Sequence, residues 1–154
     1  ALAVIQDKLW LGADAREYLL DRFYRPRPQL AEGQLLLELA SAALDISDGF
    51  VADLGHICEC SNVGAVIDIE RLPLSAAMRA NVAAVQAKAW ALAGGDDYQL
   101  CFTVPPAKQL ALQALIDSGQ LQATIVGEIV SGSGVICRSE GVEVNVSATG
   151  YNHF

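Results

Sequence analysis

Apolar and polar positions along the chain follow two periods, one helical and one alternating. In residues 49–60 the apolar side chains recur at helical spacing, which predicts that one helix face is buried by Phe50, Leu54, Ile57 and Cys58. Residues 63–69 and 98–104 are short apolar runs rich in β-branched or aromatic side chains, which is typical of buried strands. Further helices are expected over 33–41, 75–93 and 107–118, and further strands over 43–46, 123–129, 134–138 and 142–146.

Strands that alternate with helices and end in a hairpin favour an α+β fold in which helices cover a mixed β-sheet. The glycine-rich segment 131–134 joins two of the expected strands. A phosphate-binding loop should open a helix, so this segment is interpreted as a hairpin turn. Asp53, one turn into its helix, is explained by the helix dipole and needs no function.

The first 28 residues differ from the rest of the chain. Residues 1–24 have helical periodicity with a break near Gly12, and residues 25–28 read Arg-Pro-Arg-Pro. A residue that precedes proline disfavours the α region, so 25–28 are expected to form an extended linker. We therefore expect a helical extension with its linker over 1–28 and a compact domain over 29–154. The chain opens on an apolar stretch without an initiator methionine, so we expect it to be part of a longer protein.

Composition and charge narrow the possible functions. The 154 residues are 53% hydrophobic, which suffices for one domain with a real core. The net charge of −8 is the wrong sign for a nucleic-acid binder, and no apolar run reaches the ~18–20 residues that a membrane span needs. We therefore expect neither a nucleic-acid nor a membrane partner. If the protein handles phosphates, metal ions must supply most of the positive charge.

The four cysteines favour a cytoplasmic protein with reduced thiols. Cys58, Cys60, Cys101 and Cys137 contain no C-x-x-C pair, and a domain of this size needs no disulfide framework. His56, Cys58 and Cys60 could suggest a metal site, but only His56 and Cys60 share a helix face and no second ligand pair follows. Packing is the better interpretation of this trio.

The first candidate site is the segment 45–49, which reads Asp-Ile-Ser-Asp-Gly between an expected strand and an expected helix. Such strand ends are where α/β folds gather ligand groups. Asp45 and Asp48, with the Ser47 hydroxyl, suit a hard cation such as Mg²⁺, and the helix N-terminus offers N–H donors to an anion. The simpler alternative is that Ser47 or Asp48 caps the helix and Asp45 is an exposed strand-end residue.

Two other segments contain candidate ligand groups. Residues 94–98 read Gly-Gly-Asp-Asp-Tyr: either one of the acids faces a ligand, or both only form a turn after a helix. The end of the chain, 150–154, reads Gly-Tyr-Asn-His-Phe. We expect it to dock onto the domain, where an aromatic ring could stack on a flat heterocycle. His153 is interpreted as a packed residue.

Together, these segments resemble the C-terminal domain of the thiamine-monophosphate kinase family, within the aminoimidazole-ribonucleotide-synthetase-like (AIR-synthase-like) superfamily. The resemblance runs from the linker at 25–28 to the end of the chain. It is carried by the acidic turn at 45–49 followed by Asp53-Leu54, and by the segments 61–65, 72–73, 90–92, 94–98 and 150–154. The order and spacing of these motifs are more specific than any one of them.

The resemblance implies that the full-length protein transfers the γ-phosphoryl group of ATP to thiamine monophosphate with Mg²⁺, giving thiamine diphosphate. By resemblance, Asp45 and Asp48 bind magnesium, Ser47 contacts ATP, and Asp96 and Tyr151 contact thiamine monophosphate. The catalytic residues are left unassigned: the substrate's own phosphate oxygen attacks, so no side chain is needed as a covalent nucleophile and no general base is named. Family members are dimers formed largely through an N-terminal ATP-binding domain.

Three departures from the family pattern affect the expected site. The family usually has Glu at the positions of Asp96 and Gln99, and Asp at the position of Asn152. The family's N-terminal domain is missing from this chain, so the chain alone is expected to be inactive, whereas the full-length protein is expected to be a homodimer. The alternatives are another enzyme of the superfamily, of the selenophosphate-synthetase or hydrogenase-maturation type, or a non-enzymatic binding or dimerisation module.

Overall fold

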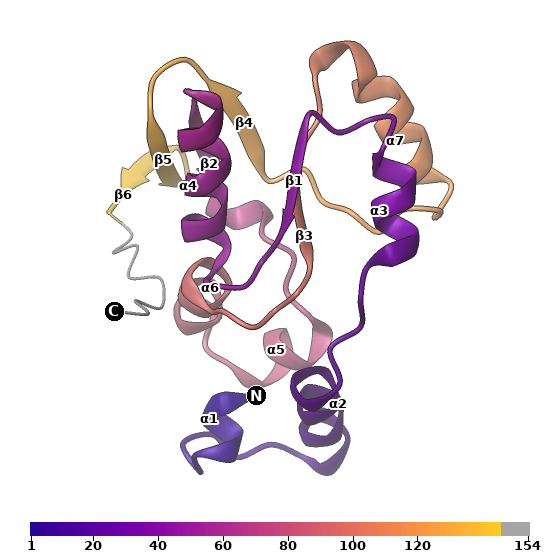
Figure 1. Ribbon diagram of the computed structural model, residues 1–154. Helices are drawn as coiled ribbons and strands as arrows, with labels where there is room; N and C mark the ends of the chain where they lie inside the picture. The colour runs from indigo at the N-terminus through magenta and orange to yellow at the C-terminus, as the bar shows by residue number, and fades with distance from the viewer. Residues whose placement is uncertain (146–154) are drawn as a thin grey trace.

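Two separate β-ladders organise the chain in the computed structural model, which describes residues 1–145 (Figure 1). β1 (Ala42–Asp45) pairs antiparallel with β3 (Leu100–Thr103). The second sheet has the order β4-β2-β5-β6, formed by Gly127–Val130, Gly64–Asp68, Gly134–Ser139 and Val142–Val144. Since β2 runs parallel to β5 and antiparallel to β4, the expected mixed sheet covered by helices is confirmed.

Helix α4 (Phe50–Ser61) connects the two ladders, because it packs against β2 and β5 of one and against β1 and β3 of the other. The expected apolar face of this helix is confirmed: Phe50, Leu54, Ile57 and Cys58 are all buried. The other helices are α1 (Leu2–Ile5), α2 (Ala13–Tyr24), α3 (Leu30–Leu36), α5 (Ala76–Asn81), α6 (Ala84–Ala93) and α7 (Gln109–Asp117), with short 3-10 turns at Ile69–Arg71 and Pro106–Lys108.

The apolar interior is divided into two clusters. The larger surrounds α4 and reaches both ladders; its buried members are Ile46, Phe50, Val51, Leu54, Ile57, Cys58, Ala65, Ile67, Ile69, Leu92, Cys101 and Cys137. The smaller lies between α3 and α7 and is formed by Leu36, Leu112 and Leu121. Each fully buried aliphatic side chain contributes about 1.5–3 kcal/mol of burial free energy, so the α4 cluster dominates the stability of the domain.

The glycine-rich segment 131–133 is not a hairpin turn, contrary to the sequence-based expectation. β4 and β5, which it connects, do not pair with each other because β2 lies between them. The tight hairpin instead joins β5 to β6 through Glu140 and Gly141, whose φ angles are 51° and 81°. Two successive positive φ angles form the type of turn whose twist matches antiparallel strands.

The N-terminal region departs from the expected helix over 1–24 with a break near Gly12. Residues 6–12 separate α1 from α2, a longer break than the one expected near Gly12, and α3 begins at Leu30 rather than near 33. No side chain of α2 is buried, and Trp10 is 87% exposed. In the described part of the chain, no helix has the length and apolar character to cross a membrane.

We predict that truncating Leu54 destabilises the domain far more than truncating an exposed leucine. Leu54 is 3% exposed in the α4 cluster, whereas Leu110 on α7 is 87% exposed. Leu54→Ala leaves a cavity and should lower the free energy of unfolding by about 2–5 kcal/mol, whereas Leu110→Ala should change it by less than about 0.5 kcal/mol. Urea unfolding followed by circular dichroism measures both; equal losses would contradict this account of the core.

Candidate functional site

The buried carboxylate of Asp53 fixes the turn between β1 and α4. Asp53 is 4% exposed, and its Oδ2 accepts hydrogen bonds from the backbone N–H groups of Ser47, Asp48 and Gly49, at 2.9, 3.0 and 3.1 Å. Three charge-assisted hydrogen bonds at a helix N-terminus, where the helix dipole favours negative charge, compensate for burying this carboxylate.

The N-terminus of α4 is not capped by the residues expected from the sequence. The N-cap of α4 is Gly49 and no side chain caps it, so the expectation that Ser47 or Asp48 would be the cap is wrong. Asp53, given only a dipole role from the sequence, turns back from inside the helix and satisfies the donors before it. The available signal was an acid in the first helical turn, as in a capping box, although one position later than that motif requires.

The segments 45–48 and 94–99 lie side by side, because the β1–β3 ladder continues past its last strand pair, Asp45 and Leu100. The N–H of Ile46 donates to the carbonyl of Gln99 at 2.8 Å, and the N–H of Tyr98 donates back to the carbonyl of Ile46 at 2.8 Å. The N–H of Asp96 donates to the carbonyl of Ser47 at 2.9 Å. The structure therefore brings the two acidic segments, which are about fifty residues apart, into one place.

Two glycines permit this close approach of backbones. Gly49 has φ +119°, and a Cβ on it would lie 2.9 Å from the carbonyl carbon and oxygen of Ala93. A Cβ on Gly95 would lie 2.4 Å from the carbonyl oxygen of Ser47. Both distances are shorter than real Cβ contacts, and the neighbouring atoms are backbone atoms that cannot turn away. Larger side chains at these positions would separate the two acidic segments.

Tyr98 interacts with acids of both segments: it is hydrogen-bonded to Asp96 and lies within the electrostatic influence of Asp45. Its hydroxyl donates to Oδ1 of Asp96 at 3.0 Å. The hydrogen bond to Asp96 and the charge of that carboxylate raise the pKa of Tyr98, and the charge of Asp45 adds a smaller increase. The charges of Asp45 and Asp96 therefore both raise the pKa of the Tyr98 hydroxyl. These two sequence-predicted residues lie near the same side chain.

The pKa of Asp97, the remaining acid of the second segment, depends partly on a charge in the helical extension. Desolvation raises the pKa of the Asp97 carboxyl, although the residue as a whole is exposed, and the positive charge of Arg22 on α2 opposes this increase. Arg22 lies over the ring of Tyr18, 5.7 Å from its centroid. The extension therefore brings positive charge towards a segment that is otherwise acidic.

The structure brings together potential metal ligands other than the trio His56, Cys58 and Cys60, which was considered from the sequence. In the described part of the chain, the donor atoms of Asp48, Asp53 and His56 lie within 4.8 Å of one another. Cys58 instead faces the core and Cys60 is exposed. All four cysteines have free thiols, and burial raises the pKa of Cys101 to about 12, so this thiol stays protonated. Carboxylate oxygens are the ligands that hard divalent cations prefer.

The terminal segment that contains Tyr151 and Asn152 lies outside the described residues, so the proposed aromatic contact with substrate stays a prediction. Gln99 is exposed beside Tyr98, and its carbonyl pairs with Ile46. The structure therefore brings Asp45, Ser47, Asp48 and Asp96 into one place, whereas it leaves Tyr151 undetermined.

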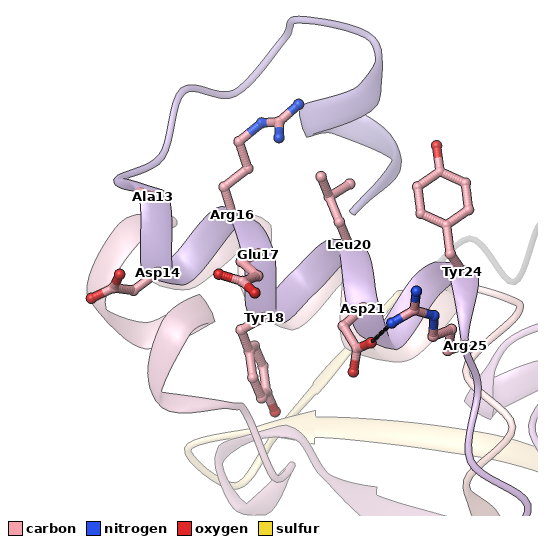
Figure 2. A pocket seen from close by; sticks show the side chains of 9 residues that line it. All are labelled: Ala13, Asp14, Arg16, Glu17, Tyr18, Leu20, Asp21, Tyr24 and Arg25. Atoms are coloured by element: carbon pink, nitrogen blue, oxygen red, sulfur yellow. Dashed lines mark hydrogen bonds and ion pairs between the residues drawn. The ribbon is translucent and has the colours of Figure 1, made fainter.

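Two hollows in the surface lie away from the acidic segments. One, of about 1180 Å³, follows α2 and is lined only by residues 13–25, among which Arg25 bridges to Asp21 at 3.4 Å (Figure 2). The other, of about 820 Å³, lies between the two ladders and is lined mainly by apolar side chains, including Phe50 and Leu112. Neither includes Asp45, Asp48 or Asp96. The candidate site thus lies outside both of these hollows, at the junction of the two segments.

Comparison with known proteins finds one matching family and several similar proteins. Residues 6–139 match the family described as AIR synthase related protein, C-terminal domain. The chain is 41% identical to the thiamine-monophosphate kinases of Salmonella typhimurium and of Escherichia coli K12, over 99% of this chain and 48% of theirs. The chain therefore spans about half the length of the curated relatives that it matches.

Several solved structures are similar in fold to this chain. Thiamine-monophosphate kinase from Stenotrophomonas maltophilia superposes with a TM-score of 0.80 at 39% identity, over 92% of this chain and 46% of that protein. AaThiL complexed with AMPPCP and TMP superposes with a TM-score of 0.78 at 29% identity, over 99% of this chain and 46% of that one. Escherichia coli HypE, a hydrogenase maturation protein, shares the fold with a TM-score of 0.57 at 23% identity, over 73% of this chain and 38% of that one.

We predict that Asp53→Asn destabilises the domain through the turn before α4. The amide has no negative charge, and it cannot accept three N–H donors as a carboxylate does, so buried donors lose part of their compensation. The free energy of unfolding should fall by about 1–3 kcal/mol. Asp14→Asn, an exposed acid in the first turn of α2, is the matched control and should have little effect. Thermal unfolding of both variants decides; wild-type stability of Asp53→Asn would overturn the role of this carboxylate.

Proposed function

This chain belongs to the AIR synthase related protein family as its C-terminal domain, and we propose that it is half of an enzyme that phosphorylates thiamine monophosphate. The full-length enzyme would transfer the γ-phosphoryl group of ATP to that substrate, giving thiamine diphosphate. The main support is the junction of the segments 45–48 and 94–99, where the backbones of two acidic segments lie side by side. The 41% identity to thiamine-monophosphate kinases over 99% of the chain supports the choice of substrate.

We propose the same domain division as the sequence analysis: a helical extension and linker over 1–28 and the AIR-synthase-like domain over 29–154. The coverage of 48% of the curated relatives supports a further ATP-binding domain in the full-length protein. The proposed partners are ATP, thiamine monophosphate, that N-terminal domain and a second copy of the full-length chain in a homodimer. The free thiols of all four cysteines agree with a cytoplasmic location.

Magnesium is the proposed metal, and the residues at the junction fit it. Asp45, Asp48 and Asp96 offer carboxylate oxygens, the donors that Mg²⁺ prefers. By resemblance to the family, we assign metal binding to Asp45 and Asp48. Oδ2 of Asp53 instead accepts hydrogen bonds from three backbone N–H groups. When bound, the metal supplies the positive charge that two phosphorylated substrates require beside a chain of net charge −8.

The chain's own residues would bind and orient the reactants. Phosphoryl transfer depends on positioning and charge stabilisation rather than on covalent chemistry by the protein. We propose that Ser47 contacts ATP and that Asp96 and Tyr151 contact thiamine monophosphate. A phosphate oxygen of thiamine monophosphate attacks the γ-phosphorus of ATP, the bond to the bridging oxygen of ADP breaks, and no side chain becomes covalently modified. Asp96 is one methylene shorter than the glutamate usual in the family, so its reach to substrate is shorter.

In the full-length protein, Asp45→Asn and Asp48→Asn should each lower kcat/KM by about 100- to 1,000-fold, because each removes a negative charge that holds the metal. Folding should be nearly unaffected, since neither residue belongs to the buried core. Steady-state kinetics with Mg²⁺ varied should also reveal a raised metal requirement. Asp14→Asn on α2 is the matched control, and near wild-type activity of both site variants would leave these acids as structural residues only.

The chain of 154 residues by itself should fold and make no thiamine diphosphate, because the proposed ATP-binding domain is absent. Chromatographic analysis after incubation with ATP, Mg²⁺ and thiamine monophosphate tests the activity, and cooperative thermal unfolding of the same sample tests the folding. Measurable product from this chain would contradict a site shared between two domains. An unrelated domain encoded before Ala1 would instead favour a binding or dimerisation module.

A further inference from the structure

Tyr98 has a backbone conformation that bulky residues rarely adopt. Its φ is +54°, in the left-handed region, and that of Asp96 two residues earlier is +57°. Such conformations are energetically costly and persist only where the surrounding structure enforces them. Aspartate tolerates this region better than most residues because its short polar side chain can hydrogen-bond to nearby backbone, whereas a bulky tyrosine side chain cannot do so.

Contacts with the first acidic segment enforce this conformation. The N–H of Tyr98 donates to the carbonyl of Ile46 at 2.8 Å, and the N–H of Asp96 donates to the carbonyl of Ser47 at 2.9 Å. Gly95, which precedes Asp96, lies so close to the Ser47 carbonyl that a side chain there would clash. The turn of the chain at 96–98 is therefore held from outside, by the backbone of the segment that contains Asp45 and Asp48.

The consequence of the strained turn is the direction of two side chains. Both Tyr98 and Asp96 have a left-handed backbone conformation. The Tyr98 hydroxyl donates a hydrogen bond to Oδ1 of Asp96 at 3.0 Å. Both residues are exposed, so without this hydrogen bond the Asp96 carboxylate would be free to rotate in solvent. The bond occupies one carboxylate oxygen as an acceptor and leaves Oδ2 as the oxygen available to a ligand. The raised pKa of Tyr98 keeps the phenol a neutral donor well above pH 7.

We propose that Tyr98 is a positioning residue that orients the Asp96 carboxylate towards thiamine monophosphate. The proposal rests on the proposed function, and specifically on the contact between Asp96 and that substrate. Tyr98 acts through Asp96 and does not itself touch the reacting atoms. ATP, which we assign to Ser47 and the metal ligands, should be nearly indifferent to the Tyr98 hydroxyl.

Tyr98→Phe in the full-length protein tests the proposal, because it removes the hydroxyl and keeps the ring. The KM for thiamine monophosphate should rise about threefold to tenfold, the equivalent of one lost hydrogen bond. The KM for ATP and the kcat should stay within about twofold. Tyr24→Phe makes the same chemical change on α2, where the side chain is 65% exposed, and should leave all three constants unchanged.

A double-mutant cycle with Asp96→Ala, which removes the acceptor of the Tyr98 hydroxyl, separates positioning from other roles. If Tyr98 acts only through the Asp96 side chain, Tyr98→Phe should cause no further loss when Asp96 is already Ala. Independent, multiplicative losses would overturn the proposal, since Tyr98 would then act on the substrate directly. Equal losses for both substrates, with a lower Tm for Tyr98→Phe, would also overturn it, because the hydroxyl would then only stabilise the fold.

The wild-type protein distinguishes failure of this proposal from failure of the proposed function. A full-length protein that neither binds nor phosphorylates thiamine monophosphate overturns both. A wild type that uses thiamine monophosphate, with a Tyr98→Phe variant of the same KM, overturns only the role of Tyr98.

Discussion

The candidate site depends on one buried carboxylate. Asp53 is inside α4, yet it satisfies three backbone N–H groups of the turn that precedes the helix. The turn cannot relax without leaving these donors, or the buried charge itself, without partners, and each such loss is costly. The fixed turn in turn presents the carbonyls of Ile46 and Ser47 to the second acidic segment. The positions of Ser47 and Asp48 follow from this arrangement, whereas Asp45 is placed by the pairing of β1 with β3.

Acidic side chains gathered in this way repel one another, so the site must be held together by something other than its own charges. The backbone supplies that cohesion, through the extended β1–β3 ladder and the glycines that allow its close approach. The same repulsion makes a divalent cation a natural ligand. Arg22 of the helical extension is a protein cation whose charge reaches this region, through Asp97. In the proposed phosphate-handling role, a bound divalent cation would supply positive charge beside a domain of charge −8.

The two-ladder architecture explains where the site lies. Helix α4 packs against both ladders with its apolar face, and its N-terminus therefore sits at the end of β1, beside the start of β3 (Figure 1). The larger core anchors this helix, so the turn before it has a rigid support. In the helical extension, Leu2, Ile5 and Trp10 expose apolar side chains to solvent, whereas Val4 of α1 is buried.

The sequence by itself predicted most of the helices and strands and the buried face of α4, because local periodicity carries that information. Its motifs also carried the family resemblance and the candidate acids. It did not determine that β2 lies between β4 and β5, so the segment 131–133 was misread as a hairpin. It also assigned the cap of α4 to the wrong residues and gave Asp53 no role. Strand order depends on contacts between residues far apart along the chain. The partners of the Asp53 carboxylate depend on the path of the backbone in the turn before α4. Only the tertiary structure decided them, since no local pattern records which donors a side chain meets.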